Sequence, residues 1–381
     1  MNTALSRLNG PQRAAWNHVE AVVQRRSQEA RARLVRFLDS TGCALSMLDA
    51  GLEAVREHAR VVLHFHPDRI GVRRVTVAES LLDEGQYRSQ FETGLSSGSL
   101  SAFPGGPRDA WERTLFGGAY HRSDSALEDR PKYGALELIR YPDGPWPRFG
   151  SCYFVLKRDV GRRTSFTFSG SEQPDAPERL GTLDNLECVL AALVAEVAGG
   201  QGATVPWPPF VAPTLGVKDL SVPRLLDRLA RDLTHPRRDA STGSAGRVLD
   251  SGIEAQVHGP IHMGCDVERL VVDPSFAGTP TGDCLEELCR KYAIPLERHV
   301  GFRLAVRDVP DDFRGPAIAS IARRIANDGM IDASVIGAAQ RSLRLEPEKW
   351  RDVGSQEELS EHLKKLWHVL VHYGSPYSPL K

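Results

Sequence analysis

The middle of this chain consists of short β-type runs, whereas both ends carry apolar residues at helical spacing. From Arg73 onward, β-branched and aromatic residues recur in brief runs punctuated by Gly, Pro and Ser. The runs cover residues 75–77, 87–91, 134–139, 151–156, 165–168 and 253–257. Because strands and helices are segregated along the chain, this order predicts an α+β fold with a mostly antiparallel central sheet.

Helical patterns flank these runs on both sides. Residues 12–63 predict two or three N-terminal helices, since apolar positions recur there at intervals of three and four without an interrupting proline after Ala14. Further helices are expected over residues 184–198, 285–293, 316–327, 333–343 and 356–371. The proline-rich residues 205–213 predict an extended linker, and residues 237–247 a Gly/Ser/Arg loop. We therefore divide the chain into an N-terminal helical segment, 1–63, and a main domain, 64–381.

The overall charge excludes a bulk attraction to nucleic acid or to an anionic membrane. Lys and Arg number 48 against 49 Asp and Glu, so any basic site must be local. Six scattered cysteines favour a reducing compartment and structural thiols over a disulfide scaffold. Since no apolar stretch has the length of a signal peptide core or a membrane span, we expect a protein made in the cytosol.

Residues 86–98 combine an arginine with a turn rich in Gly and Ser. In a strand, Tyr87, Ser89 and Phe91 would share one face and leave Arg88 on the other. A guanidinium beside exposed backbone N–H groups suits a pyrophosphate. A surface arginine before an ordinary turn is the alternative.

Residues 164–171 alternate hydroxyl and aromatic side chains. Ser165, Thr167 and Ser169 fall on one strand face, and Phe166 and Phe168 on the other. We expect the aromatic face to pack in the core. The hydroxyl row either supports a neighbouring catalytic side chain or is solvated.

Residues 253–260 place Glu254, Gln256 and His258 on one strand face and end in Gly259-Pro260. Three successive polar side chains are typical of the wall of a site, and a solvated edge strand is the alternative.

The order of Arg88, a Ser/Thr strand and a Glu254-x-Gln256 strand resembles the Arg–Ser–Glu arrangement of cholera-toxin-type ADP-ribosyltransferases. Longer strings extend the likeness over about residues 64–374: Phe65-His66-Pro67-Asp68-Arg69, Tyr87-Arg88-Ser89-Gln90-Phe91-Glu92-Thr93-Gly94, Phe116-Gly117-Gly118-Ala119-Tyr120, Pro131-Lys132-Tyr133-Gly134-Ala135-Leu136, Glu254 to Gly259, and Leu366 to Gly374. Together they are similar to a bacterial family, formerly described only as a domain of unknown function, that includes type III secretion effectors. Those effectors ADP-ribosylate ubiquitin on a threonine.

The resemblance implies a split, mostly antiparallel β-sheet core, NAD as co-substrate without a metal, and ubiquitin or another host protein as acceptor. It also implies secretion into a host cytosol without a cleavable signal peptide. The catalytic residues that it implies are Arg88, Ser165, Glu254 and Gln256. The NAD-binding residues that it implies are Arg88, Ser89, Thr93, Gly94, Tyr133, Thr167 and Glu254.

The chemistry of such an enzyme needs a carboxylate at the reacting ribose. Loss of nicotinamide passes through an oxocarbenium-like state, which a nearby carboxylate stabilises. The family's usual pattern ends in the catalytic Glu, whereas here Glu254 comes first and Gln256 second. We expect Glu254 to be indispensable, with Gln256 on the ribose as the alternative. A base for the acceptor hydroxyl could be Glu254 or His258, with Asp68 as a third candidate.

Two other functions fit parts of the sequence. His64-x-His66 is a pattern with which several metal-dependent hydrolases begin, and other histidines could complete such a site. The following Pro67-Asp68-Arg69 fits a capped turn better, with Asp68 bonded to backbone. A non-catalytic ubiquitin-binding module is the second alternative, and it predicts no cleavage of NAD.

Overall fold

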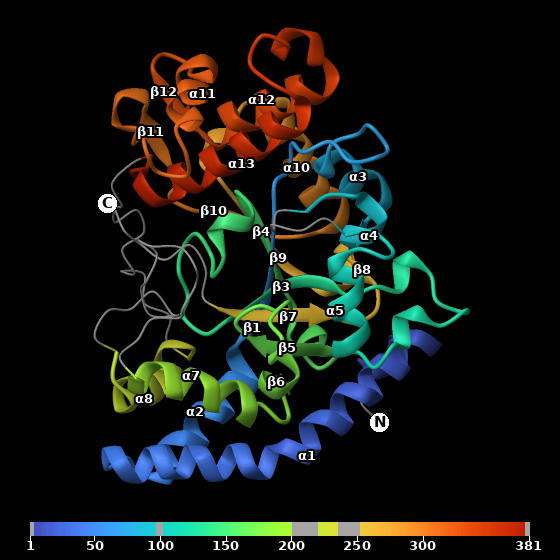
Figure 1. The fold of residues 1–381 in the computed structure, drawn as a ribbon, viewed down its shortest axis with the longest axis vertical. Helices are drawn as coiled ribbons and strands as arrows, with labels where there is room; N and C mark the ends of the chain where they lie inside the picture. Colours follow the sequence, from blue (N-terminus) through green and yellow to red (C-terminus); the bar gives the residue numbers. More distant parts are fainter. Residues whose placement is uncertain (1–3, 97–101, 200–219, 235–251, 378–381) are drawn as a thin grey trace.

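The structure is a computed structural model that describes residues 4–96, 102–199, 220–234 and 252–377 (Figure 1). Its helices are α1 (Gly10–Thr41), α2 (Leu45–His58), α3 (Val77–Glu84), α4 (Gln90–Thr93), α5 (Pro107–Leu115), α6 (Arg158–Gly161), α7 (Glu187–Gly199), α8 (Val222–Asp232), α9 (Met263–Asp266), α10 (Pro280–Tyr292), α11 (Ala317–Ile325), α12 (Ala333–Leu345) and α13 (Gln356–Tyr373). Its strands are β1 (Arg60–Phe65), β2 (Gln86–Tyr87), β3 (Lys132–Glu137), β4 (Cys152–Leu156), β5 (Thr164–Phe168), β6 (Leu180–Thr182), β7 (Ile253–Val257), β8 (Ile261–His262), β9 (Val267–Val272), β10 (Leu296–Arg298), β11 (Arg303–Ala305) and β12 (Met330–Asp332).

Eight strands form one sheet in the order β10-β9-β4-β1-β3-β7-β5-β6. All of its neighbours pair antiparallel except β10 and β9, which are parallel. The pairs β2–β8 and β11–β12 stand apart from this sheet. The prediction of a mixed fold with a mostly antiparallel central sheet is confirmed.

Most of the predicted elements form close to their expected limits. β3, β4, β5 and β7 correspond to four of the predicted runs, and α7, α10, α11, α12 and α13 to the five later helices. These elements were predictable because an alternating or helical apolar pattern reports which side of an element is buried. The predicted linker at 205–213 and loop at 237–247 lie outside the described residues.

Three local predictions are wrong. The helical segment was expected to reach Leu63, but β1 already begins at Arg60. The strand was not recognised because a strand that is buried on both faces has a continuous apolar run instead of an alternating pattern. Residues 75–77 form no strand, because Thr76 caps the start of α3. The run 87–91 is also no strand beyond Tyr87, because Ser89 caps α4. In both helices the N3 glutamate completes a capping box, a local signal that outweighs β propensity.

The N-terminal helices pack against the sheet domain. α1 begins at an Asn9–Gln12 capping box and ends at Gly42, whose φ of 70° terminates the helix. It packs on α7 and α2 packs on α8, while α11–α13 lie at the other end of the molecule (Figure 1). The predicted boundary between residues 63 and 64 falls within β1.

The main hydrophobic cluster takes in side chains from one face of the sheet, and a separate, smaller cluster consists of Val62, Tyr153, Val155 and Val271. Phe166 and Phe168 belong to the main hydrophobic cluster together with Ala255, as the alternation of β5 predicted.

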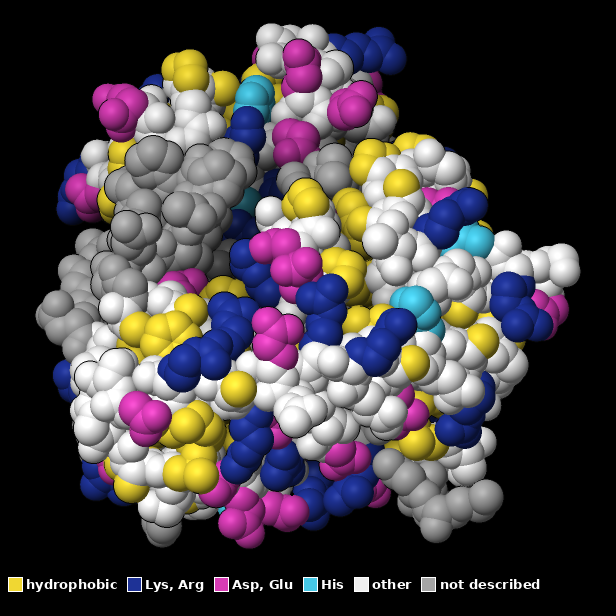
Figure 2. Space-filling model, turned by 60° about the horizontal axis from the view of Figure 1, so that its bottom comes forward, with side chains coloured by type: hydrophobic (Ala, Val, Ile, Leu, Met, Phe, Trp, Pro, Cys, Tyr) yellow, Lys and Arg dark blue, Asp and Glu magenta, His cyan; other side chains and the backbone are white. Residues whose placement is uncertain are grey.

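No helix in the described parts of the chain is long and apolar enough to cross a membrane. On the face seen in Figure 2, basic and acidic side chains are interspersed, as the near-zero net charge leads one to expect.

Candidate functional site

A cavity of about 190 Å³ lies against the sheet on the side of Val62, Ala135 and Glu254. The sheet contributes three neighbouring residues to the cavity lining. Val62 of β1 pairs with Ala135 of β3, and Ala135 pairs with Glu254 of β7. Its walls come from the segment after β1, from α3 and from the β2–α4 segment. Tyr133 and Arg108 complete the lining near Glu254.

The charged lining of this cavity favours an anionic ligand. Its cationic residues are Arg69, Arg73, Arg88, Arg108 and Lys132, and its carboxylates are Glu92 and Glu254. Burial lowers the pKa of Lys132 to about 8, and its Nζ donates to the carbonyl of Glu128 at 2.9 Å. Apolar and aromatic side chains supply much of the remaining lining, as is usual for small-molecule sites.

Glu254 stands at the end of a row of buried polar side chains on β5 and β7. Antiparallel pairing sets Ser165 opposite Gln256 and Thr167 opposite Glu254. The Nε2 amide of Gln256 donates to Glu254 Oε1 and to Thr167 Oγ1, both at 3.0 Å. Ser165 Oγ donates to Gln256 Oε1 at 2.9 Å. The hydroxyl row therefore supports the carboxylate, and the alternative of a solvated strand face is wrong.

Only Glu254 of this row reaches the cavity. Gln256, Ser165 and Thr167 are completely buried and do not line it. Burial raises the pKa of Glu254 to about 7, while hydrogen bonds from the Ser171 backbone N–H and from Gln256 act in the opposite direction. A carboxyl group with such a pKa gains or loses its proton near neutral pH, as acid–base catalysis requires.

Arg88 lines the cavity, but its guanidinium is already paired. Its Nε donates to Glu84 and its Nη1 to Glu92 at 2.8 Å. Its side chain is 34% exposed, and it follows β2 on the segment that leads into α4. The expectation that Arg88 projects from a strand is wrong. A phosphate would have to compete with two carboxylates for this arginine.

Arg108 is one of the lining cations that the sequence analysis did not identify. It lies at the start of α5, is 6% exposed, and lines the cavity. Its guanidinium stacks on the rings of Trp111 and Tyr133, with 4.7 Å from Cζ to each ring centroid. It forms no hydrogen bond or ion pair with any residue in the described parts of the chain, and its Nε is buried without a partner. The only local signal was Gly-Gly-Pro before it, which marks a helix start.

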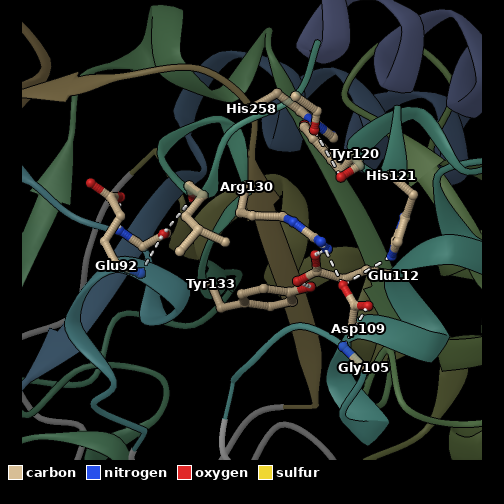
Figure 3. A network of polar contacts seen from close by, with 12 residues as sticks. Glu92, Gly105, Asp109, Glu112, Tyr120, His121, Arg130, Tyr133 and His258 are labelled. Carbon is tan, nitrogen blue, oxygen red and sulfur yellow. Dashed lines mark hydrogen bonds and ion pairs between the residues drawn. The ribbon is translucent and has the colours of Figure 1, made fainter. Parts of the chain in front are cut away.

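Tyr133 contributes its ring to the cavity, because its hydroxyl is used elsewhere. The hydroxyl donates to Glu112 Oε1 at 2.6 Å, and Arg130 holds Glu112 Oε2 at 2.8 Å (Figure 3). Arg130 also donates to Asp109, at 2.5 Å, and His121 contacts the same carboxylate oxygen. This buried network fixes Tyr133, and α5, on which Arg108 stands.

The remaining predicted NAD-binding residues divide into two groups. Thr93 lines the cavity, but its hydroxyl donates to the carbonyl of Ser89 at 3.1 Å. Ser89 is buried, caps α4, and donates to the carbonyl of Leu127. Gly94 ends α4 with a φ of 65° and is not part of the lining. The structure thus brings Arg88, Thr93, Tyr133 and Glu254 to one cavity, whereas Ser89 and Gly94 are not part of its lining.

His64, the first residue of the possible metal motif, is engaged by backbone groups at both ring nitrogens. Nε2 accepts the N–H of Trp146 at 3.2 Å, so Nδ1 carries the proton and donates to the carbonyl of Gly150 at 3.3 Å. That leaves no lone pair for a metal. Within the described ranges, no cluster of three or more suitable side chains could hold one. Asp68 is buried in the turn after β1, outside the cavity lining, and burial raises its pKa to about 7.

Comparison with known proteins gives one family. A family model described as "Protein of unknown function (DUF3626)" matches residues 60–373. No curated protein matches the chain. The match runs from the first residue of β1 to the last residue of α13, so it includes the whole cavity and excludes only α1 and α2 among the long helices. Because it covers most of the sequence, this chain belongs to the DUF3626 family.

Proposed function

We propose that the protein is a mono-ADP-ribosyltransferase that moves ADP-ribose from NAD to a threonine hydroxyl of a protein acceptor, with ubiquitin as the first candidate. The observation that carries the proposal is the meeting of two groups in one cavity. Glu254 reaches it from a row of buried polar side chains, and Arg108 reaches it as a buried cation that forms no ion pair within the described residues. The likeness to Arg–Ser–Glu transferases supports the same reading.

The two groups suit the two parts of the dinucleotide. Arg108 can donate to phosphate oxygens without first breaking an ion pair, whereas Arg88 must leave Glu84 and Glu92. We therefore assign the main pyrophosphate contact to Arg108 and an auxiliary one to Arg88. The stacked rings of Trp111 and Tyr133 hold the guanidinium in place, which limits the entropy that binding must remove.

Glu254 is the residue we assign to the reacting ribose. Departure of nicotinamide leaves positive charge on the ribose, which the ionised carboxylate stabilises. Gln256 positions Glu254 and does not touch the ribose, because it is completely buried and both of its amide atoms are occupied. His258 is likewise completely buried, and burial lowers its pKa to about 3. Glu254 is therefore also our candidate base for the acceptor hydroxyl.

The test measures nicotinamide release and label transfer. The full chain is incubated with labelled NAD, with and without ubiquitin, beside Glu254→Gln and Arg108→Gln. We expect Glu254→Gln to lose both signals and Arg108→Gln to raise the KM for NAD at least about tenfold, as the loss of a charge-assisted hydrogen bond predicts. Arg113→Gln is the matched control, because Arg113 is exposed on the same helix.

Three results would refute the proposal or redirect it. Absence of nicotinamide release by the wild type, with ubiquitin or host lysate, refutes the transferase. Ubiquitin binding without release supports a non-catalytic binding module. Metal-dependent hydrolysis that His64→Ala abolishes supports the hydrolase.

A further inference from the structure

Behind the Gln256–Glu254 pair, the chain of buried hydrogen bonds continues to two residues that no part of the proposed reaction uses. Ser165 Oγ lies 3.1 Å from Nε2 of His258. The other ring nitrogen, Nδ1, lies 2.6 Å from the hydroxyl of Tyr120 (Figure 3). His258 comes from the end of β7, and Tyr120 from the segment after α5. The result is one continuous chain from Tyr120 to Glu254.

Donor and acceptor chemistry gives this chain a single direction. A neutral histidine has one N–H, so one ring nitrogen donates and the other accepts. If Tyr120 donates to Nδ1, His258 Nε2 donates to Ser165, Ser165 to Gln256 Oε1, and Gln256 Nε2 to Glu254. The reverse direction would leave the Tyr120 hydroxyl proton without an acceptor in the described parts of the chain.

The surroundings of His258 keep it neutral and immobile. The ring is completely buried and makes edge contacts with Trp16 of α1 and with Phe116, at 5.9 and 5.2 Å between ring centroids. The cationic groups that act on it are Arg163 and Lys132, and like burial they disfavour a second proton. Helix α1, which lies outside the family match, thus helps to enclose the chain of hydrogen bonds.

We propose that Tyr120 and His258 are positioning residues that fix the direction of this hydrogen-bond chain and thereby hold the amide N–H of Gln256 toward Glu254. With the amide reversed, Gln256 would place a second acceptor 3.0 Å from Glu254 Oε1, which would displace the carboxylate or force it to bind a proton. The structural part of this proposal stands alone, and its catalytic consequence rests on the proposed function.

The structural part is tested on the wild-type protein by ¹⁵N NMR of labelled histidine, with the His258 signals assigned from their loss in His258→Gln. We expect the Nε2–H tautomer, unchanged between pH 5 and 8. A predominant Nδ1–H tautomer, or a doubly protonated ring in that range, overturns the proposal. This measurement needs no turnover, so it is decisive even if the protein does not cleave NAD.

The catalytic consequence is tested with a matched pair of tyrosine variants. Tyr120→Phe removes the donor to His258. Tyr153→Phe removes another buried hydroxyl, which does not line the cavity and donates to the carbonyl of Pro142 at 2.7 Å. We expect Tyr120→Phe to lower kcat for nicotinamide release by about ten- to a hundredfold with the KM for NAD unchanged, the effect of a misplaced catalytic group. Equal kcat values for the two variants, or a change confined to KM, overturn the catalytic role. An inactive wild type refutes the proposed function and leaves the tautomer result standing.

Discussion

Replacing Glu254 by Gln should stabilise the folded protein at alkaline pH and have little effect at acidic pH. Burial raises the pKa of this carboxyl to about 7 from its ordinary value of 4.5. The contribution of Glu254 to stability is therefore full below pH 4.5, decreases as the pH rises toward 7, and is constant above. Gln at position 254 keeps the carbonyl oxygen that accepts from Ser171 and Gln256, but it carries no charge to be desolvated.

The size of the effect follows from the two pKa values. Ionisation of Glu254 costs the folded state about 3 kcal/mol at pH 8 but only about 1 kcal/mol at pH 5. Glu254→Gln should therefore gain about 2 kcal/mol relative to the wild type between these pH values. Other groups that titrate in this range, such as Asp68 and Glu137, are common to both proteins and cancel in the difference.

The assay is urea unfolding of both proteins at pH 5 and pH 8, monitored by circular dichroism. Glu53→Gln is the control, because Glu53 is exposed on α2 and lies outside the cavity lining. If the stability difference between Glu254→Gln and the wild type is the same at both pH values, the carboxyl is not desolvated in the fold. Glu254 would then not be tuned for chemistry near neutral pH.

Three further predictions concern the stability of the fold. Arg88→Gln should lower the unfolding free energy, measured by urea unfolding, by about 1 kcal/mol, because the carboxylate of Glu92 loses its partner. An unchanged unfolding free energy would mean that the ion pairs of Arg88 do not form in solution. Gly134→Ala should lower the unfolding free energy by about 1–3 kcal/mol or prevent folding, since the added Cβ would clash with the carbonyl oxygen of Val62. Wild-type stability of this variant in urea would show that β1 and β3 are not so closely paired. Asp266→Ala should lower the unfolding free energy in urea by about 3 kcal/mol, since it leaves the buried Arg163 without its carboxylate and frees Arg7. A decrease below about 1 kcal/mol would contradict the buried ion pair.

Much of the candidate site could be predicted from the sequence because strand alternation is a local property. Ser165 and Thr167 opposite Phe166 and Phe168 required only a period of two, and β5 buries its aromatic face as predicted. The same reasoning placed Glu254, Gln256 and His258 on one face. It failed at Arg88, where the capping box of Ser89 and Glu92 starts a helix and ends the strand.

What the sequence alone determined is the burial pattern of single elements: the helices at both ends, the strands between them, and the hydroxyl and carboxyl rows. Only the tertiary structure decided which rows meet. The pairing of β5 with β7 converts two separate patterns into one hydrogen-bonded row beneath Glu254. Packing of α5 beside β3 brings Arg108 to the same cavity, while Glu84 and Glu92 neutralise Arg88. Local periodicity cannot report such long-range partners, because it contains no information about which buried faces and charges come into contact.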